Sequence, residues 1–240
     1  MEKQMPIKTY LWIEDSKAGC VFWQRFMQQL CPEVVVESKK NCSELVRAVR
    51  SLGGSDNRYI IALDNSFDNL QSVMERKLLK RYTEGQDNIF LMDVICFEYI
   101  LLEFKDLIKW IYAAGDEFLV KRAKAVAARE KLVGSIASGN LDYKAMQEVV
   151  AYDRHLEGHN IEQLAARLLF DLTRNTGFEV SKGAIGECWI KSCCEWEGRQ
   201  EDDICGLDGS RLAIFDKMKT VYEKTSIKAQ FQKAGLEVVL

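Results

Sequence analysis

Two stretches of this sequence place an acidic side chain directly after an apolar run that has the pattern of a buried strand. Residues 9–13 end at Glu14, and residues 59–63 end at Asp64. Ligands of open α/β sheets bind outside the carboxyl ends of the strands, so both carboxylates are expected at one edge of a sheet. Carboxylates at such an edge suit a divalent metal or a phosphoryl group. Asp68 follows shortly after Asp64, as a further ligand or as a helix cap.

Strands and helices that alternate along residues 8–112 must position these side chains. Each strand-like run is short and apolar, and each segment after it has one apolar face. Ser16 is the expected N-cap of the first helix, and Asn41 or Ser43 that of the second. We therefore predict an α/β fold with a mainly parallel sheet, flanked by helices on both faces. The strands are expected at residues 9–13, 34–36, 59–63 and 88–92, and the helices begin near residues 16, 41, 70 and 97, the last continuing to residue 111.

The second half of the chain has a different pattern. Residues 116–175 show helical periodicity, with a clear amphipathic helix at 161–172. Six of the 15 glycines and four of the eight cysteines fall within residues 177–209, which indicates a compact irregular module. We predict a core at residues 1–112 and a helical extension at residues 113–240, which carries the Cys/Gly-rich module and ends in a strand-like run at 236–240.

The composition bounds the class of protein. The chain has 240 residues, of which 48% are hydrophobic and 29% charged, an ordinary globular balance. Its net charge of -3 excludes a polycationic nucleic-acid binder, so such binding needs a local basic patch. It contains no apolar run of about 18 residues, and residues 1–6 lack a signal-peptide core. We therefore expect a cytoplasmic protein without membrane contact and with reduced cysteines.

The acids at the strand ends resemble a known family. A glutamate after the first strand (Glu14) and an acid after the third (Asp64) are similar to the pattern of Toprim domains, which occur in topoisomerases, primases and the overcoming-lysogenisation-defect nucleases. The residues after the fourth strand, with Glu98 between Phe97 and Tyr99, resemble those of small Toprim-like proteins found beside ATPases in bacterial defence operons. The resemblance covers roughly residues 8–112.

The resemblance implies a function and roles for these residues. It implies a Toprim/Rossmann-like core, Mg²⁺ or Mn²⁺ as cofactor, a nuclease or phosphoryl-transfer activity on nucleic acid, an ATPase partner and a part in antiviral defence of bacteria. Glu14 would then be the general base or a metal ligand. Asp64 and Asp68 would be magnesium ligands. Glu98 would support a second metal or position a water.

Two other interpretations remain open. The family's Glu-Gly pair is Glu14-Asp15 in this chain, and Ser66 replaces the second acid of its Asp-x-Asp motif, which favours a non-catalytic interaction module. The acids after the first strand also resemble a receiver-like signalling domain, with Asp64 as phospho-acceptor. A receiver needs a fifth strand, whereas the sequence after residue 110 has a helical pattern.

Basic stretches on two predicted helices are candidates for contact with phosphates. A charged helix face is more often simply solvated, so this interpretation gains weight only together with a metal site. The candidate nucleic-acid-binding residues are Arg76, Lys77, Lys80, Arg81, Lys121, Arg122 and Lys124.

Cysteines and histidines give weaker signals. Cys188, Cys193 and Cys205 could hold zinc, but their spacing matches no standard zinc finger, and small buried side chains are the favoured interpretation. His155 and His159 have the spacing of two ligands on one helical face. A glycine between them and the absence of a surrounding zincin motif favour surface positions.

Overall fold

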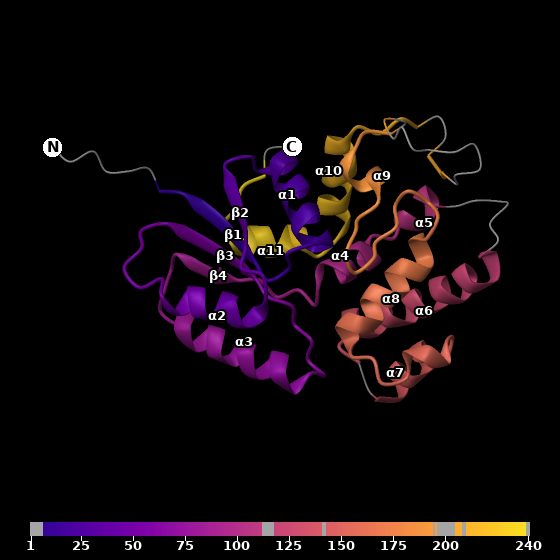
Figure 1. The fold of residues 1–240 in the computed structure, drawn as a ribbon, viewed down its shortest axis with the longest axis horizontal. Coiled ribbons are helices and arrows are strands. Elements are labelled where there is room, and N and C mark those ends of the chain that lie inside the picture. Colours follow the sequence, from indigo (N-terminus) through magenta and orange to yellow (C-terminus); the bar gives the residue numbers. More distant parts are fainter. Residues whose placement is uncertain are drawn as a thin grey trace.

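The computed structural model describes residues 7–111, 118–140, 143–193, 195, 205–207 and 210–238. Its centre is a four-stranded parallel sheet in the order β2-β1-β3-β4, with helices on both faces, so the predicted fold class is confirmed (Figure 1). The described helices include none that is both long and apolar enough to cross a membrane. The strands are β1 (Thr9–Ile13), β2 (Val34–Ser38), β3 (Arg58–Ala62) and β4 (Ile89–Leu91).

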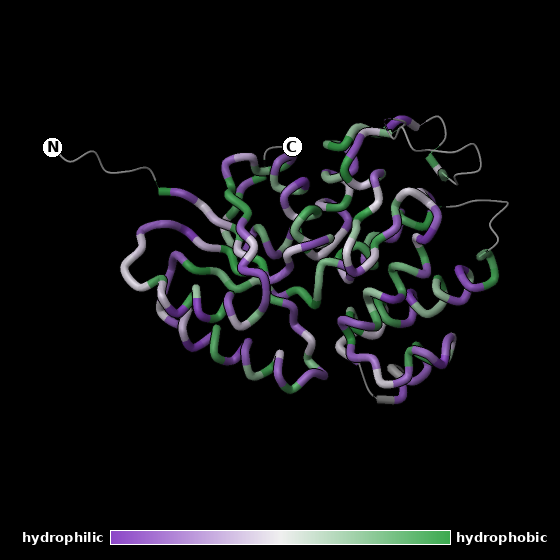
Figure 2. Tube along the Cα trace, in the orientation of Figure 1, coloured by the Kyte–Doolittle hydropathy of each residue, from purple (hydrophilic) through white to green (hydrophobic). Residues whose placement is uncertain are grey.

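Alternate side chains of the strands build two hydrophobic clusters, because successive residues of a strand point to opposite faces. Leu11 and Ile60 pack with α1 on one face, whereas Trp12 and Ile61 pack with α2 and α3 on the other. Figure 2 shows apolar strands between helices whose colour changes from turn to turn, as in amphipathic helices. These helices are α1 (Ala18–Leu30), α2 (Cys42–Arg50) and α3 (Leu70–Thr83).

The start of α1 differs from the prediction that Ser16 caps it. The carboxylate of Asp15 accepts hydrogen bonds from the backbone amides of Lys17 and Gly19, both at 2.8 Å, so it satisfies the first turn instead. A Cβ at Gly19 would lie 2.3 Å from that carboxylate. The prediction for the second helix is confirmed, since the side chain of Asn41 accepts from the amide of Glu44.

The long helix expected at residues 97–111 is in fact two helices. It breaks at Phe104, whose backbone is in the extended region. The ring of Phe104 packs edge-on against that of Trp110, with ring centroids 4.6 Å apart. The guanidinium of Arg129 donates to the carbonyls of Leu102 and Glu103 at 2.6 and 3.2 Å. A buried arginine therefore supplies donors to the carbonyls at the end of the first helix, which would otherwise need the next helical turn. The two are α4 (Phe97–Glu103) and α5 (Leu107–Trp110).

The extension consists mainly of helices packed beside the sheet, at the right of Figure 1. The guanidinium of Arg122 donates to the carbonyls of Leu172 and Arg174, so α6 also secures the end of α8. The described part of the Cys/Gly-rich module contains a β-bridge between Val180 and Ile185. The helices are α6 (Leu119–Ala137), α7 (Tyr143–Val150), α8 (Ile161–Thr173) and α9 (Glu187–Ile190), with a 3₁₀ turn at Arg154–Leu156.

The last two helices return to the sheet. Phe231 packs against Phe26 of α1 with ring centroids 5.9 Å apart, and the side chain of Gln230 accepts from the amide of Asp93 at 2.9 Å. One hydrophobic cluster thus includes residues from both sides of position 112. The strand-like run expected at the chain end is not a strand over residues 236–238, and residues 239–240 lie outside the described part. These helices are α10 (Ile214–Lys224) and α11 (Ile227–Lys233).

Candidate active site

A cavity of about 880 Å³ lies between the carboxyl edge of the sheet and helix α8, and five carboxylates line it. One of them, Asp15, accepts hydrogen bonds from the first turn of α1, and the other four form the candidate site. Glu14 follows β1 and Asp64 follows β3, and these strands are direct neighbours with Ile13 paired to Ala62. Glu98 lies in the first turn of α4. The fourth carboxylate, Glu162, lies in the first turn of α8. The predicted meeting of Glu14, Asp64 and Glu98 at one edge is therefore what the structure shows.

Glu14 and Asp64 form a hydrogen-bonded carboxyl pair. Burial raises the pKa of Glu14 to about 7, the negative charge of Glu162 adds to the rise, and the hydrogen bonds with Asp64 oppose it. The pKa of Asp64 lies well above its usual range, first through burial and then through the charges of Glu14, Glu98 and Glu162. Two facing carboxyl groups that share a buried edge cannot both ionise without cost.

The pKa of Glu98 is also raised. Burial raises its pKa to about 7, and the charges of Asp15 and Glu162 act in the same direction. Hydrogen bonds from its own backbone amide and from the thiol of Cys96 act against the rise. Among the described residues, no ion pair joins a lysine, arginine or histidine to any of the four carboxylates of the candidate site. The described residues therefore supply no direct ion-pair partner to these acids, in agreement with their raised pKa values.

Glu162 was missed by the sequence analysis. The hydroxyl of Ser66, which is fully buried, donates to its carboxylate at 2.9 Å. A capping box of Asn160 and Gln163 begins the helix on which it lies. The sequence does show this capping pattern before an amphipathic helix, but it carries no signal that the helix docks at the sheet edge.

Asp68 lies outside the cavity lining. Both of its carboxylate oxygens accept from the backbone amide of Ile161, at 3.2 and 2.9 Å. Asp68 was considered as a metal ligand or as a helix cap. The structure shows it as a cap, but of α8, which is distant in the sequence.

Cationic side chains also line the cavity. Lys17, Lys40 and Lys182 are exposed there, and His159 is half-buried. Arg167 of α8 also lines the cavity, and its guanidinium donates to the buried carboxylate of Asp171 at 3.0 Å. The cavity is thus lined by acids as well as cations; we call Glu14, Asp64, Glu98 and Glu162 its acidic floor and the cationic side chains its basic surround. His155 is exposed and His159 is partly exposed, as expected for surface residues.

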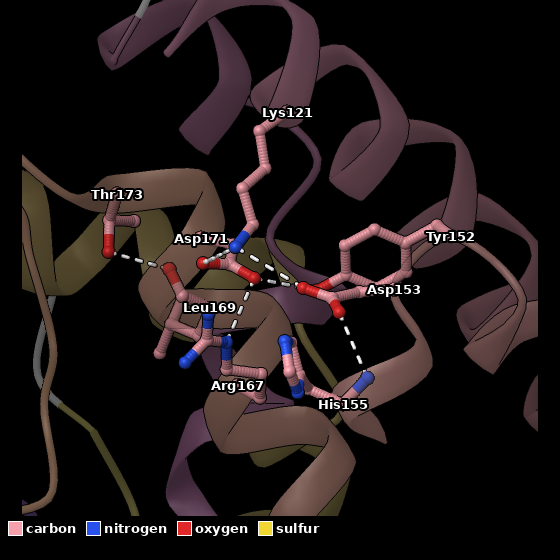
Figure 3. Close-up of polar contacts among 8 residues, drawn as sticks. All are labelled: Lys121, Tyr152, Asp153, His155, Arg167, Leu169, Asp171 and Thr173. Atoms are coloured by element: carbon pink, nitrogen blue, oxygen red, sulfur yellow. Dashed lines mark hydrogen bonds and ion pairs between the residues drawn. The ribbon is translucent and has the colours of Figure 1, made fainter. Parts of the chain in front are cut away.

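Asp171 is the centre of a polar network within the extension (Figure 3). Its carboxylate accepts from the hydroxyl of Tyr152 at 2.8 Å as well as from Arg167, and the ammonium of Lys121 lies 3.6 Å away. Lys121 also pairs with Asp153 at 3.3 Å. This network joins α6 to α8 and fixes the guanidinium of Arg167 beside the cavity.

The candidate nucleic-acid-binding residues divide into two groups. Arg76 is buried and donates to the carbonyls of Leu63 and Met92, at the ends of β3 and β4, and to Asp93. Arg122 and Lys121 make the internal contacts already described. Such contacts indicate structural roles. The others are exposed on helix surfaces, namely Lys77, Lys80 and Arg81 on α3 and Lys124 on α6.

The acidic floor fits a hard divalent cation in its chemistry. Its donors are carboxylate oxygens, and within the described ranges no lysine, arginine or histidine forms an ion pair with them. In the described part of the chain, no group of three or more His, Cys, Asp or Glu side chains is arranged to hold a metal ion. Magnesium often binds through one or two carboxylates with waters and phosphate oxygens, so Glu14 and Asp64 would suffice. Zinc at Cys188, Cys193 and Cys205 stays the untested alternative to the favoured interpretation of these residues as small packed side chains.

Comparisons with protein-family models, with curated proteins and with solved structures found no match to this chain. The Toprim-like resemblance therefore rests on the quoted motifs alone. The receiver-like interpretation requires a fifth strand after β4, and the described residues that follow β4 as far as residue 111 form helices.

Proposed function

We propose that this protein is a divalent-metal-dependent phosphoryl-transfer enzyme that acts on nucleic acid, as a nuclease does. The observation that carries the proposal is the convergence of Glu14, Asp64 and Glu98 from three separate segments in one cavity. The raised pKa values of these groups support it, because they come first from burial and then from mutual repulsion, and a bound cation would favour the ionised form against both.

The basic surround supports a phosphate ester as substrate. Lys17, Lys40 and Lys182 are exposed around the cavity, and Arg167 is held at its edge by Asp171. Cations beside a metal-binding acidic floor would attract the phosphate groups and position them at that floor. The exposed basic side chains of α3 offer a further contact for the nucleic-acid backbone.

The roles of the side chains follow from their places. Glu14 and Asp64 would hold Mg²⁺ or Mn²⁺, which when bound polarises the phosphoryl oxygens and stabilises the developing charge. Glu98, on the neighbouring helix, would orient the attacking water and accept its proton. Arg167 would hold a phosphate oxygen. The Toprim-like resemblance extends the proposal to bacterial antiviral defence with an ATPase partner.

Calorimetric titration with Mn²⁺ and Mg²⁺ tests the proposal, with and without a short oligodeoxynucleotide. We expect binding by the wild type and a loss of about 100-fold or more in affinity in Glu14→Gln and in Asp64→Asn, since each removes a charged ligand oxygen. Glu157→Gln is the matched control, because Glu157 is exposed and does not line the cavity. A cleavage screen with DNA and RNA would follow.

The result that contradicts the proposal is equally clear. If the wild type binds neither ion, alone or with the oligonucleotide, or if Asp64→Asn binds as tightly as the wild type, the acidic floor is not a metal site.

A non-catalytic interaction module is the second candidate, and one observation favours it. Ser66 stands at the second acidic position of the family's motif, and Asp68 is the next acid along the chain. In this protein both side chains form hydrogen bonds with α8. A wild type that binds no metal would move this candidate to first place.

A further inference from the structure

We propose that the cavity takes a phosphomonoester, namely a single phosphorylated nucleotide unit, and that the guanidinium of Arg167 holds its phosphate group. The unit is a free mononucleotide or the phosphorylated end of a single strand. This inference rests on the proposed function and names the substrate class of the same cavity. It excludes an internal phosphodiester of a duplex as the group that enters.

The guanidinium of Arg167 is held from one side, by a buried acid. Its Nε donates to Oδ2 of Asp171 at 3.0 Å, and the same oxygen accepts from the hydroxyl of Tyr152 at 2.8 Å (Figure 3). Asp171 is fully buried, so the anchor is fixed. Within the part of the chain that the structure describes, no group accepts a hydrogen bond from Nη1 or Nη2 of Arg167. The donors of both nitrogens are therefore left for a partner from outside, in the planar fork that matches two oxygens of a phosphate.

Arg167 lies on the face of α8 that lines the cavity. Residues 162, 163, 166 and 170 of the same helix also line it, as the helical repeat requires for one face. The side chain of Arg167 is 37% exposed, although its partner Asp171 is not exposed at all. A ligand in the cavity can thus reach a guanidinium whose orientation the protein has already set.

Three lysines favour a doubly charged group. Lys17, Lys40 and Lys182 line the same cavity from separate segments, and each is exposed. None of the three forms an ion pair with a described residue. A phosphomonoester carries a charge of about −1.5 to −2 at neutral pH and has three terminal oxygens, more of both than a phosphodiester. The fork and the lysines together therefore suit the monoester.

The rest of the lining suits the uncharged part of a nucleotide. Trp23, Phe97 and Phe170 are part of the wall, and apolar or aromatic walls bind bases and sugars by contact and stacking. The volume of about 880 Å³ lies within the range of about 300–1,000 Å³ that is usual for small-molecule sites. Double-stranded nucleic acid is instead bound on surfaces that bury about 1,000–2,500 Å² of the protein. A cavity of this size fits one nucleotide unit.

Calorimetric titration with adenosine 5′-monophosphate tests the inference, in one series with EDTA and in a second with Mn²⁺. We expect the wild type to bind the monophosphate about tenfold or more tightly than adenosine, because adenosine lacks the group that accepts charge-assisted hydrogen bonds. Arg167→Lys keeps a positive charge but loses the planar fork, so its affinity for the monophosphate should fall about tenfold. Arg154→Lys is the matched control, because Arg154 is exposed and does not line the cavity.

Short oligodeoxynucleotides separate the two sources of the phosphate. A single strand with a 5′-phosphate should bind about tenfold more tightly than the same strand without it, and more tightly than a blunt duplex with the same phosphate. If the monophosphate binds and the phosphorylated strand does not, the ligand is the free mononucleotide.

The outcomes distinguish this inference from the proposed function. The inference is overturned if the wild type binds the monophosphate in neither series, if it binds adenosine as tightly, or if Arg167→Lys binds the monophosphate like the wild type. A duplex bound as tightly as the phosphorylated single strand overturns it as well. In each of these cases, Mn²⁺ binding that is lost in Asp64→Asn leaves the proposed function standing. If the wild type binds no Mn²⁺ but its binding of the monophosphate depends on Arg167, the proposed function fails and the nucleotide site remains.

Discussion

Asp64 and Asp171 are two enclosed carboxylates in opposite electrostatic surroundings. Asp171 is fully buried, and it is bonded to Tyr152 and Arg167 with Lys121 nearby. Asp64, at the floor of the cavity, is bonded to another acid and has further acids around it. Asp171 is paired with cations from the chain itself, whereas no cation among the described residues forms an ion pair with Asp64.

The difference shows how to tell a structural charge from a functional one. A buried charge that is part of the framework is paired and hydrogen-bonded, because an unpaired one is strongly unfavourable. The carboxyl groups at the sheet edge have hydrogen bonds but no ion pair with a cation among the described residues, and their pKa values are raised. Strongly perturbed acids in a cavity are therefore better guides to function than buried charges as such.

The largest expected effect separates the two carboxylates by stability. We predict that Asp171→Asn lowers the free energy of unfolding by about 2–3 kcal/mol, because it removes the anion paired with Arg167 and one of the two anions near Lys121. Asp64→Asn should not lower it, since burial and the neighbouring acids already disfavour the ionised form of Asp64 and no cation is left without a partner. Urea unfolding at neutral pH without divalent ions measures both, with Glu157→Gln as the control. Equal losses in the two variants would refute the comparison.

A second prediction concerns pH. The pKa values of Glu14 and Glu98 are about 7 in the folded protein, against 4.5 ordinarily, so the folded state holds protons that the unfolded state has lost. Their contribution to stability is full below about pH 4.5 and is lost as the pH rises through about 7. Melting temperatures across this window should fall less in the Glu14→Gln, Glu98→Gln double variant than in the wild type. Excess magnesium should also flatten the wild-type curve, and parallel curves for the wild type and the double variant would contradict the assignment.

The smallest effect on stability is expected on α3. Replacing the exposed Lys77, Lys80 and Arg81 by glutamine should change the free energy of unfolding by less than about 0.5 kcal/mol, because none of them is buried. If these side chains contact phosphates, affinity for an oligonucleotide should fall and the slope of log affinity against log salt should decrease by up to about 3. Lys124→Gln on α6 serves as a comparison. An unchanged slope in the triple variant would show that these side chains of α3 face solvent and do not contact phosphates.

The sequence was informative where a pattern is local. The strands before Glu14 and Asp64 were predictable because each is an apolar run that stops at an acid. That the two acids lie close together was predictable because the carboxyl ends of parallel strands meet at one edge of the sheet. The break at Phe104 was not predictable, because it depends on Arg129 from a distant helix. Glu162 could not be found for the same reason, since its position depends on the docking of α8.

The basic stretches show the same limit. Arg76, Lys77 and Lys80 are indistinguishable by composition, yet Arg76 joins the ends of two strands and the others face solvent. Which member of a charged run is buried depends on the packing of the helix against its sheet. The pattern predicted the helix, and the tertiary contacts assigned the roles.

The contact between Ser66 and Glu162 joins residues 96 positions apart in the chain. Contacts of such sequence separation require closure of a long loop, and proteins rich in them fold slowly. During synthesis, the acidic edge of the sheet can form long before α8 has left the ribosome, but its fourth carboxylate cannot yet be present. The complete set of acids therefore assembles only after most of the polypeptide has been made. A nascent chain without α8 does not yet have the complete cavity.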